Sequence, residues 1–234
     1  MTKLLNAAVL FDLDGTLLDT ALDLGATANY ILKRFGYKGK ISDKSAREYA
    51  SDGMAALLNE GARSAEEKIL ADDLPKMKHE FLNYYDQHFA ERTVPFPGIT
   101  EVMEYLYAQN AKTAIITNKP DKTAINLIKH FPCFNKLDYI LGSRPDIPGK
   151  PAPDAIFEAL KNLAVKPQNA IYVGDHERDM EAASRAGVTG VCAGWGYLHF
   201  GTNPSSLGGK ITVNSPRELK SCLVSFMNKL CIVE

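Results

Sequence analysis

The residues with the clearest capacity for chemistry follow an apolar run near the start of the chain. Residues 7–11 are all apolar and read as a buried strand, and the run stops at Asp12, Leu13, Asp14 and Gly15. Acids placed at the C-terminal end of a parallel strand lie where open α/β sheets bind ligands. Two carboxylates this close repel each other unless a cation or a proton holds them, so the pair predicts a divalent metal with a reacting group beside it.

Two other interpretations apply to this acid pair. A surface turn is the ordinary setting of an isolated Asp-x-Asp-Gly, and only later sites in the chain argue against it. A calcium loop needs acids at its first, third and fifth positions and Gly at its sixth. Thr16 and Leu17 fill the fifth and sixth positions here, and a strand precedes them, so the sequence excludes the calcium loop.

Strand and helix patterns alternate over the second half of the chain. Buried strands are predicted over residues 113–116, 139–142, 170–173 and 190–193, with helix-period segments between them. Such alternation predicts a parallel sheet with helices on both faces. The expected fold class is therefore α/β, with a doubly wound parallel sheet.

The intervening residues 19–92 contain no convincing strand. Apolar residues recur there at spacings of three and four, which predicts helices. We expect a small all-helical domain over residues 19–92, inserted into a core domain made of residues 1–18 and 93–234.

Composition excludes several classes of function. The chain is 45% hydrophobic and 24% charged with a net charge of −1, so it has no overall field to attract nucleic acid or anionic lipid. No apolar run approaches the roughly 20 residues of a membrane span. The cysteines, Cys133, Cys192, Cys222 and Cys231, form no C-x-x-C pair, and we interpret them as reduced thiols of a cytoplasmic protein. Nothing in the sequence indicates the oligomeric state.

Three later sites join the acid pair, each at a strand end or a helix start. They are Thr117 with Asn118, Lys150, and Asp175 with Asp179. Each alone has a simpler interpretation, because Thr117 could cap a turn, Lys150 could be a surface charge and Asp175 could cap a helix. Their order along the strand pattern carries more information than any one of them.

In this order, the sites resemble the motifs of the haloacid dehalogenase superfamily. Those motifs are Asp-x-Asp-x-Thr after the first strand, Thr or Ser after the second, Lys before a later helix, and Gly-Asp-x-x-x-Asp after the fourth strand. This chain has them at residues 12–16, Thr117, residues 149–154 and residues 174–179. The match spans the whole chain, and the resemblance identifies the helical insert as a cap domain.

The resemblance implies a phosphatase. Asp12 would be the nucleophile that forms an aspartyl-phosphate, and Asp14 would protonate the leaving alkoxide and then take a proton from water. Mg²⁺ would bind to Asp12, the Asp14 carbonyl oxygen and Asp175. The second acid favours a phosphatase, because dehalogenases of the superfamily lack it.

The resemblance also implies a phosphate site. Thr117 and the Asn118 amide would hold phosphoryl oxygens, and Lys150 would add a compact positive charge. Asp179 would orient Lys150 or a metal-bound water.

The expected substrate is a small phosphate monoester, not a nucleic acid or a membrane component. Residues 11–20, 117–120 and 195–197 look like the phosphoglycolate phosphatase group, whereas residues 196–204 look more like a relative that acts on N-acetylmuramic acid 6-phosphate. The candidate specificity residues are Ser51, Asp52, Gly53 and Met54 in the insert, with Trp195 and Tyr197 after the fifth strand. A plain helix-helix turn is an equal interpretation of the first four.

Three other classes of protein share some of these sequence features. A phosphorylated receiver domain uses an acid pair, a Thr and a Lys on a similar sheet, but its phosphorylated Asp follows a later strand and it has no large insert. A catalytically silent binding protein would not need Asp12, Asp14, Lys150 and Asp175 intact. A phosphate-shifting mutase also keeps the second Asp, so it stays open.

Overall fold

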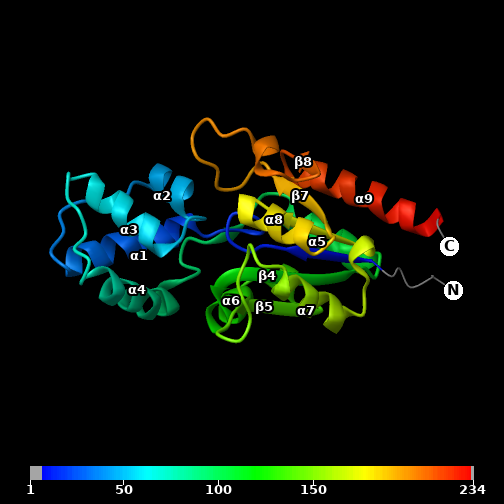
Figure 1. Ribbon diagram of the computed structural model, residues 1–234, viewed down its shortest axis with the longest axis horizontal. Helices are drawn as coiled ribbons and strands as arrows, with labels where there is room; N and C mark the ends of the chain where they lie inside the picture. Colours follow the sequence, from blue (N-terminus) through cyan, green and yellow to red (C-terminus); the bar gives the residue numbers. More distant parts are fainter. Residues whose placement is uncertain (1–6, 233–234) are drawn as a thin grey trace. The chain divides into compact units, whose positions relative to one another are not determined.

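The computed structural model describes residues 7–232, with side chains described as far as residue 229. Figure 1 shows its helices and strands. The strands are β1 (Ala8–Phe11), β2 (Leu18–Asp19), β3 (Val94–Pro95), β4 (Lys112–Pro120), β5 (Tyr139–Ser143), β6 (Ala170–Gly174), β7 (Thr189–Ala193) and β8 (Ile211–Val213). The helices are α1 (Ala21–Arg34), α2 (Asp43–Tyr49), α3 (Met54–Arg63), α4 (Leu74–His88), α5 (Ile99–Ala108), α6 (Asp121–Ile128), α7 (Asp154–Leu163), α8 (Glu177–Arg185) and α9 (Pro216–Ile232).

Six strands form one sheet in the order β5-β4-β1-β6-β7-β8. Each neighbouring pair in it is parallel. Strand β1 lies between β4 and β6, so successive strands are added first on one side of β1 and then on the other. The C-terminal end of β1 is therefore the switch point at which an α/β sheet opens a ligand crevice.

Side chains alternate between the two faces of this sheet. Leu10 of β1 and Tyr172 of β6 are partners in register. Both belong to a buried cluster that includes Ile156 of α7 and Met180 of α8. Val9 and Phe11 alternate with them and are fully buried as well. Helices α5 and α9 pack against each other and contact β4 and β8 respectively. The structure confirms the predicted doubly wound parallel fold.

The sequence predicted five strands of this sheet and missed β8. Only Val213 of that short strand is buried, while Ile211 and Thr212 are partly exposed. A strand of this kind has no continuous apolar run to reveal it.

The chain forms two compact units. One contains the described residues up to Leu17, Pro95–Gly196 and the residues from Thr202 onward, and the other contains Leu18–Val94 with Tyr197–Gly201. In the second unit, α1 packs against α2, α3 and α4. The sequence-based division assigned residues 197–201 to the core, whereas in the structure they group with the helices.

The described residues bear on membrane insertion and on the state of the cysteines. None of their helices is both long and apolar enough to cross a bilayer. Cys133, Cys192 and Cys222 carry free thiols. The side chain of Cys231 lies outside the description.

Candidate active site

Asp12 stands immediately after β1, and its backbone is fixed by the neighbouring strand. Its N–H donates to the Val173 carbonyl oxygen of β6 at 2.9 Å. Its Oδ1 accepts the Leu13 N–H at 2.7 Å. Gly15 has φ +79°, a left-handed conformation that glycine adopts without strain, and it turns the chain away from the sheet. Asp12 as a residue is only 3% exposed, so its charge needs a partner.

Lys150 supplies that partner. Its Nζ lies 2.8 Å from Asp12 Oδ1 and 2.6 Å from Asp179 Oδ1, and its side chain is 1% exposed. The Asn118 side chain holds the Lys150 backbone, with Nδ2 donating to the Lys150 carbonyl oxygen and Oδ1 accepting the Lys150 N–H, both at 2.9 Å. The Asn118 side chain is therefore committed to positioning Lys150.

The charges set the protonation states of the two acids. Burial disfavours ionisation of Asp12, but Lys150 and then Arg178 more than offset it, so the pKa of Asp12 lies below its ordinary value. Burial raises the pKa of Asp179, with Lys150 opposing and the Asp12 charge adding to that rise. Asp12 is therefore held as the carboxylate, the form that a nucleophile requires.

Asp179 is fixed from two sides. It occupies the first turn of α8, where its Oδ2 accepts the N–H of the N-cap residue His176 at 3.1 Å. Its other oxygen faces Lys150. The start of α8 thus carries a carboxylate that holds the ammonium group against Asp12.

Asp175 follows β6 and is 1% exposed. Its Oδ1 accepts the Thr16 hydroxyl at 2.8 Å, and the Thr16 carbonyl oxygen accepts the Trp195 Nε1–H at 3.1 Å. A Cβ at position 196 would lie 2.2 Å from the Cβ of Asp175, so only Gly196 allows the loop after β7 to approach so closely.

Three acids at this strand edge can hold a metal ion. One carboxylate oxygen from each of Asp12, Asp175 and Asp179 lies within 4.8 Å of the others, and all three residues are buried. An all-oxygen, acidic set suits a hard divalent cation. Both oxygens of Asp179 are engaged, Oδ1 by Lys150 and Oδ2 by the His176 N–H, whereas the contacts of Asp12 to Leu13 and Lys150 both fall on its Oδ1. Asp12 is therefore better placed than Asp179 to bind a cation.

Asp14 and Thr117 lie at neighbouring strand ends. Asp14 Oδ2 pairs with Lys119 Nζ at 3.1 Å, and the Lys119 side chain is 6% exposed. Thr117 is 5% exposed, and its hydroxyl oxygen accepts the Lys119 N–H at 3.2 Å. The C-terminal part of β4 therefore contributes a lysine at the second acid in addition to the predicted Thr and Asn.

Sequence reasoning gave no role to four residues that the structure brings to this site, namely Thr16, Lys119, Tyr172 and Arg178. Thr16 and Lys119 lie inside the motifs already recognised. Tyr172 is a polar side chain in the otherwise apolar run 170–173, and a buried tyrosine hydroxyl usually has a hydrogen-bond partner. Arg178 also lies inside a recognised motif, at residues 174–179, but it occupies one of the positions that the motif leaves open, so nothing in the sequence marked it.

The candidate specificity residues divide between the two units. Trp195 belongs to the α/β unit, whereas Tyr197 belongs to the helical unit. The Tyr197 hydroxyl accepts the Ala21 N–H at 2.8 Å and contacts Asp19 Oδ1 at 2.9 Å. The predicted loop forms the turn between α2 and α3, with Ser51 buried, Gly53 at φ +90° as N-cap of α3 and Met54 as its first residue.

Two surface pockets are lined by residues of the helical unit. One, of about 480 Å³, is lined by Asp52 together with Tyr49, Arg63 and His199 among others. Asp52 is thus a predicted specificity residue that lines a pocket within this unit.

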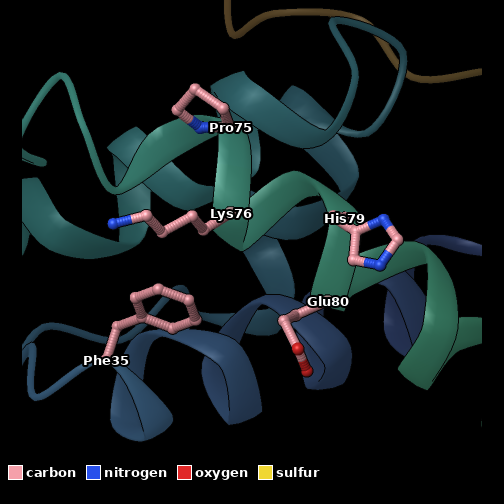
Figure 2. A pocket seen from close by; sticks show the side chains of 5 residues that line it. All are labelled: Phe35, Pro75, Lys76, His79 and Glu80. Carbon is pink, nitrogen blue, oxygen red and sulfur yellow. The ribbon is translucent and has the colours of Figure 1, made fainter.

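Another pocket, of about 530 Å³, lies where the end of α1 meets the start of α4. Figure 2 shows its lining side chains, which are Phe35, Pro75, Lys76, His79 and Glu80. It includes none of the residues that the sequence singled out.

The chain is similar to known proteins over most of its length. The family model described as haloacid dehalogenase-like hydrolase matches residues 9–193. The chain is 31% identical over 194 residues to a phosphoglycolate phosphatase of Aquifex aeolicus (strain VF5), covering 81% of this chain and 85% of the relative. It is 30% identical over 225 residues to an N-acetylmuramic acid 6-phosphate phosphatase of Pseudomonas aeruginosa, covering 94% and 95%.

A solved structure shares the fold. The crystal structure of a predicted phosphoglycolate phosphatase from Haemophilus somnus 129PT superposes with a TM-score of 0.81 at 23% identity. The superposition covers 93% of this chain and 97% of that chain.

Proposed function

The chain belongs to the haloacid dehalogenase-like hydrolases, and we propose that it is a Mg²⁺-dependent phosphatase that hydrolyses a small phosphate monoester through an aspartyl-phosphate on Asp12. The observation that carries this proposal is the buried Asp12 carboxylate, ion-paired with Lys150 at 2.8 Å at the end of β1. Relatives that share about a third of the sequence are named as phosphatases.

The first chemical step uses Asp12 and Asp14. An Asp12 oxygen attacks phosphorus, the bond from phosphorus to the leaving oxygen breaks, and Asp14 gives its proton to the leaving alkoxide. In the second step water attacks the phosphorus of the aspartyl-phosphate, and Asp14 takes the proton of that water. The bond from phosphorus to Asp12 then breaks, which regenerates the carboxylate and releases inorganic phosphate.

The remaining residues stabilise the negative charges of the phosphate group and of Asp12. Mg²⁺, bound by Asp12, the Asp14 carbonyl oxygen and Asp175, would neutralise part of the phosphate charge. Lys150 keeps Asp12 ionised and presents positive charge to the phosphoryl oxygens. Thr117 and the Asn118 backbone N–H bind those oxygens, because the Asn118 side chain is already engaged with the Lys150 backbone.

For the substrate, two candidates follow from the relatives. Phosphoglycolate is favoured by relatives such as the Aquifex enzyme. N-acetylmuramic acid 6-phosphate is favoured by the Pseudomonas enzyme, whose alignment includes more of this chain. The proposed substrate is phosphoglycolate, with N-acetylmuramic acid 6-phosphate as the alternative. Ser51–Met54, Trp195 and Tyr197 are the proposed residues that select between them. The free thiols of Cys133, Cys192 and Cys222 favour action in the cytoplasm.

The deciding experiment measures kcat/KM for both compounds beside a panel of simple sugar phosphates, with Mg²⁺ present. A preference of about a hundredfold for one compound assigns the substrate, since it exceeds what a single apolar contact provides. Equal and weak rates on the whole panel would contradict both assignments. Product analysis with a sugar phosphate separates hydrolysis from a mutase, because a mutase returns an isomeric phosphate instead of inorganic phosphate.

A further inference from the structure

Lys150 has a third polar neighbour that the proposed mechanism does not use. The Tyr172 hydroxyl accepts a hydrogen bond from Lys150 Nζ at 2.9 Å. It also donates one to the Ile116 carbonyl oxygen of β4 at 2.8 Å. We infer that Tyr172 is a positioning residue of the phosphatase, which fixes the Lys150 ammonium against Asp12.

The geometry at the ammonium supports this role. An ammonium group carries three N–H donors, and three oxygen atoms, from Asp12, Asp179 and Tyr172, lie within 2.9 Å of Nζ. Two of them are charged and pull the ammonium toward the acid cluster. The Tyr172 oxygen is uncharged and is itself held by the Ile116 carbonyl oxygen, so it fixes the ammonium without adding to the negative charge of the cluster.

Tyr172 itself cannot move easily. It is fully buried in the core cluster, and its backbone is in register with Leu10, two residues before Asp12. Its hydroxyl is anchored to Ile116, the residue before Thr117. The Tyr172 side chain therefore joins β6 and β4, the two neighbours of β1, to the ammonium of Lys150.

The protonation state of Tyr172 is suited to this role. Burial, then the nearby Asp179 and Asp12 charges, raise the pKa of Tyr172 well above its ordinary value. The hydroxyl therefore keeps its proton for the Ile116 carbonyl oxygen and presents its lone pair to Lys150. A phenolate would lose the bond to the backbone.

This inference rests on the proposed function, since Lys150 is held against the proposed nucleophile. The test variant is Tyr172→Phe, which keeps the buried ring and removes only the hydroxyl. With p-nitrophenyl phosphate and Mg²⁺, kcat should fall about 10- to 100-fold, the usual range for the loss of an outer partner of a site. KM should stay within about threefold, because the phosphate-binding groups remain in place.

The matched control is Tyr107→Phe. The Tyr107 hydroxyl also donates to a backbone carbonyl oxygen, that of Cys133 at 3.0 Å, but on α5 and away from the described site. This variant loses the same atom and the same kind of bond, so kcat should stay within about twofold of wild type while the stability changes by the roughly 1 kcal/mol of one hydrogen bond.

A double-mutant cycle separates positioning from general support of the fold. In a Lys150→Ala background, Tyr172→Phe should cost no further activity beyond about twofold, because the group that it positions is gone. Equal losses in both backgrounds, or a kcat of Tyr172→Phe like that of wild type, would overturn the inference. If Tyr172→Phe does not fold, 3-fluorotyrosine at position 172 tests the same contact, since its weaker acceptor oxygen should lower kcat and an unchanged kcat overturns the role.

Asp12→Asn, assayed in parallel, separates failure of the Tyr172 role from failure of the proposed phosphatase function. If it is inactive and Tyr172→Phe behaves like wild type, only the role of Tyr172 is wrong. If Asp12→Asn retains activity, the proposed function is wrong and the positioning role with it.

Discussion

Two clusters of the molecule have nearly the same composition and opposite surroundings. In the α/β unit, the basic group of Lys150 meets two carboxylates and the tyrosine Tyr172. In the helical unit, His199 meets Asp52 with Nε2 at 2.8 Å and Glu48 with Nδ1 at 3.7 Å, and its ring contacts Tyr49 edge-on.

Exposure separates these clusters. The Lys150 side chain is 1% exposed and its two acids 4% or less. The His199 side chain is 48% exposed, with 29% for Asp52 and 24% for Glu48. Charges in water are screened and gain little from pairing, whereas a buried charge that loses its partner is strongly destabilising. The first cluster is therefore suited to hold reacting atoms in place, and the second to fasten residues 197–201 onto the helices.

Removal of the divalent metal should cause the largest loss of activity. It should act on the buried acid cluster and leave the exposed His199 cluster unchanged. EDTA should abolish turnover of p-nitrophenyl phosphate, and Mg²⁺ should restore it. Ca²⁺ should inhibit, because its longer bonds and higher coordination number displace the nucleophile. Full activity in metal-free buffer would contradict the metal assignment.

Lys150→Ala should have the next largest effect. It leaves Asp12 and Asp179 buried without their cation, so we expect a loss of about 3–5 kcal/mol in the free energy of unfolding, measured by urea denaturation. Activity should fall by about 10²–10³ in kcat, as for the removal of one group that stabilises transition-state charge. A stable, active variant would show that the buried cluster does not depend on its lysine.

Thr16→Val tests the support of Asp175. Valine keeps the shape of the fully buried side chain and removes the hydroxyl that Asp175 accepts at 2.8 Å. The Mg²⁺ concentration that gives half-maximal activity should rise about 10- to 100-fold, with a smaller change in the maximal rate. An unchanged Mg²⁺ requirement would exclude Thr16 as a support of the metal site.

His199→Ala should have the smallest effect. It breaks the exposed contacts to Asp52 and Glu48, so the free energy of unfolding should fall by about 1 kcal/mol or less. The same urea measurement as for Lys150→Ala gives the comparison directly. A loss as large as that of Lys150→Ala would show that exposure does not separate the two clusters.

The sequence predicts the buried cluster far better than the exposed one. Asp12, Lys150 and Asp175 follow or precede strongly apolar or helical segments, so their meeting at one sheet edge follows from the parallel topology. The contact of Tyr172 with Lys150 depends on strand register and on the loop before α7, which no local pattern specifies. The contacts of Tyr197 and His199 are harder still to predict. Residues 197–201 belong to the helical unit, whereas the residues before and after them belong to the α/β unit. Strand β8 was missed for a local reason, since it has a single buried residue.

The most direct test of the central claim is to trap the covalent enzyme. Rapid mixing with a phosphate monoester and Mg²⁺, acid quenching and peptide mass spectrometry should find one phosphate on the carboxylate of Asp12. Asp12→Asn, treated identically, should carry none. Phosphate on another residue, or a wild-type chain that turns over substrate without any phosphorylated Asp12 at times shorter than one turnover, would contradict the account.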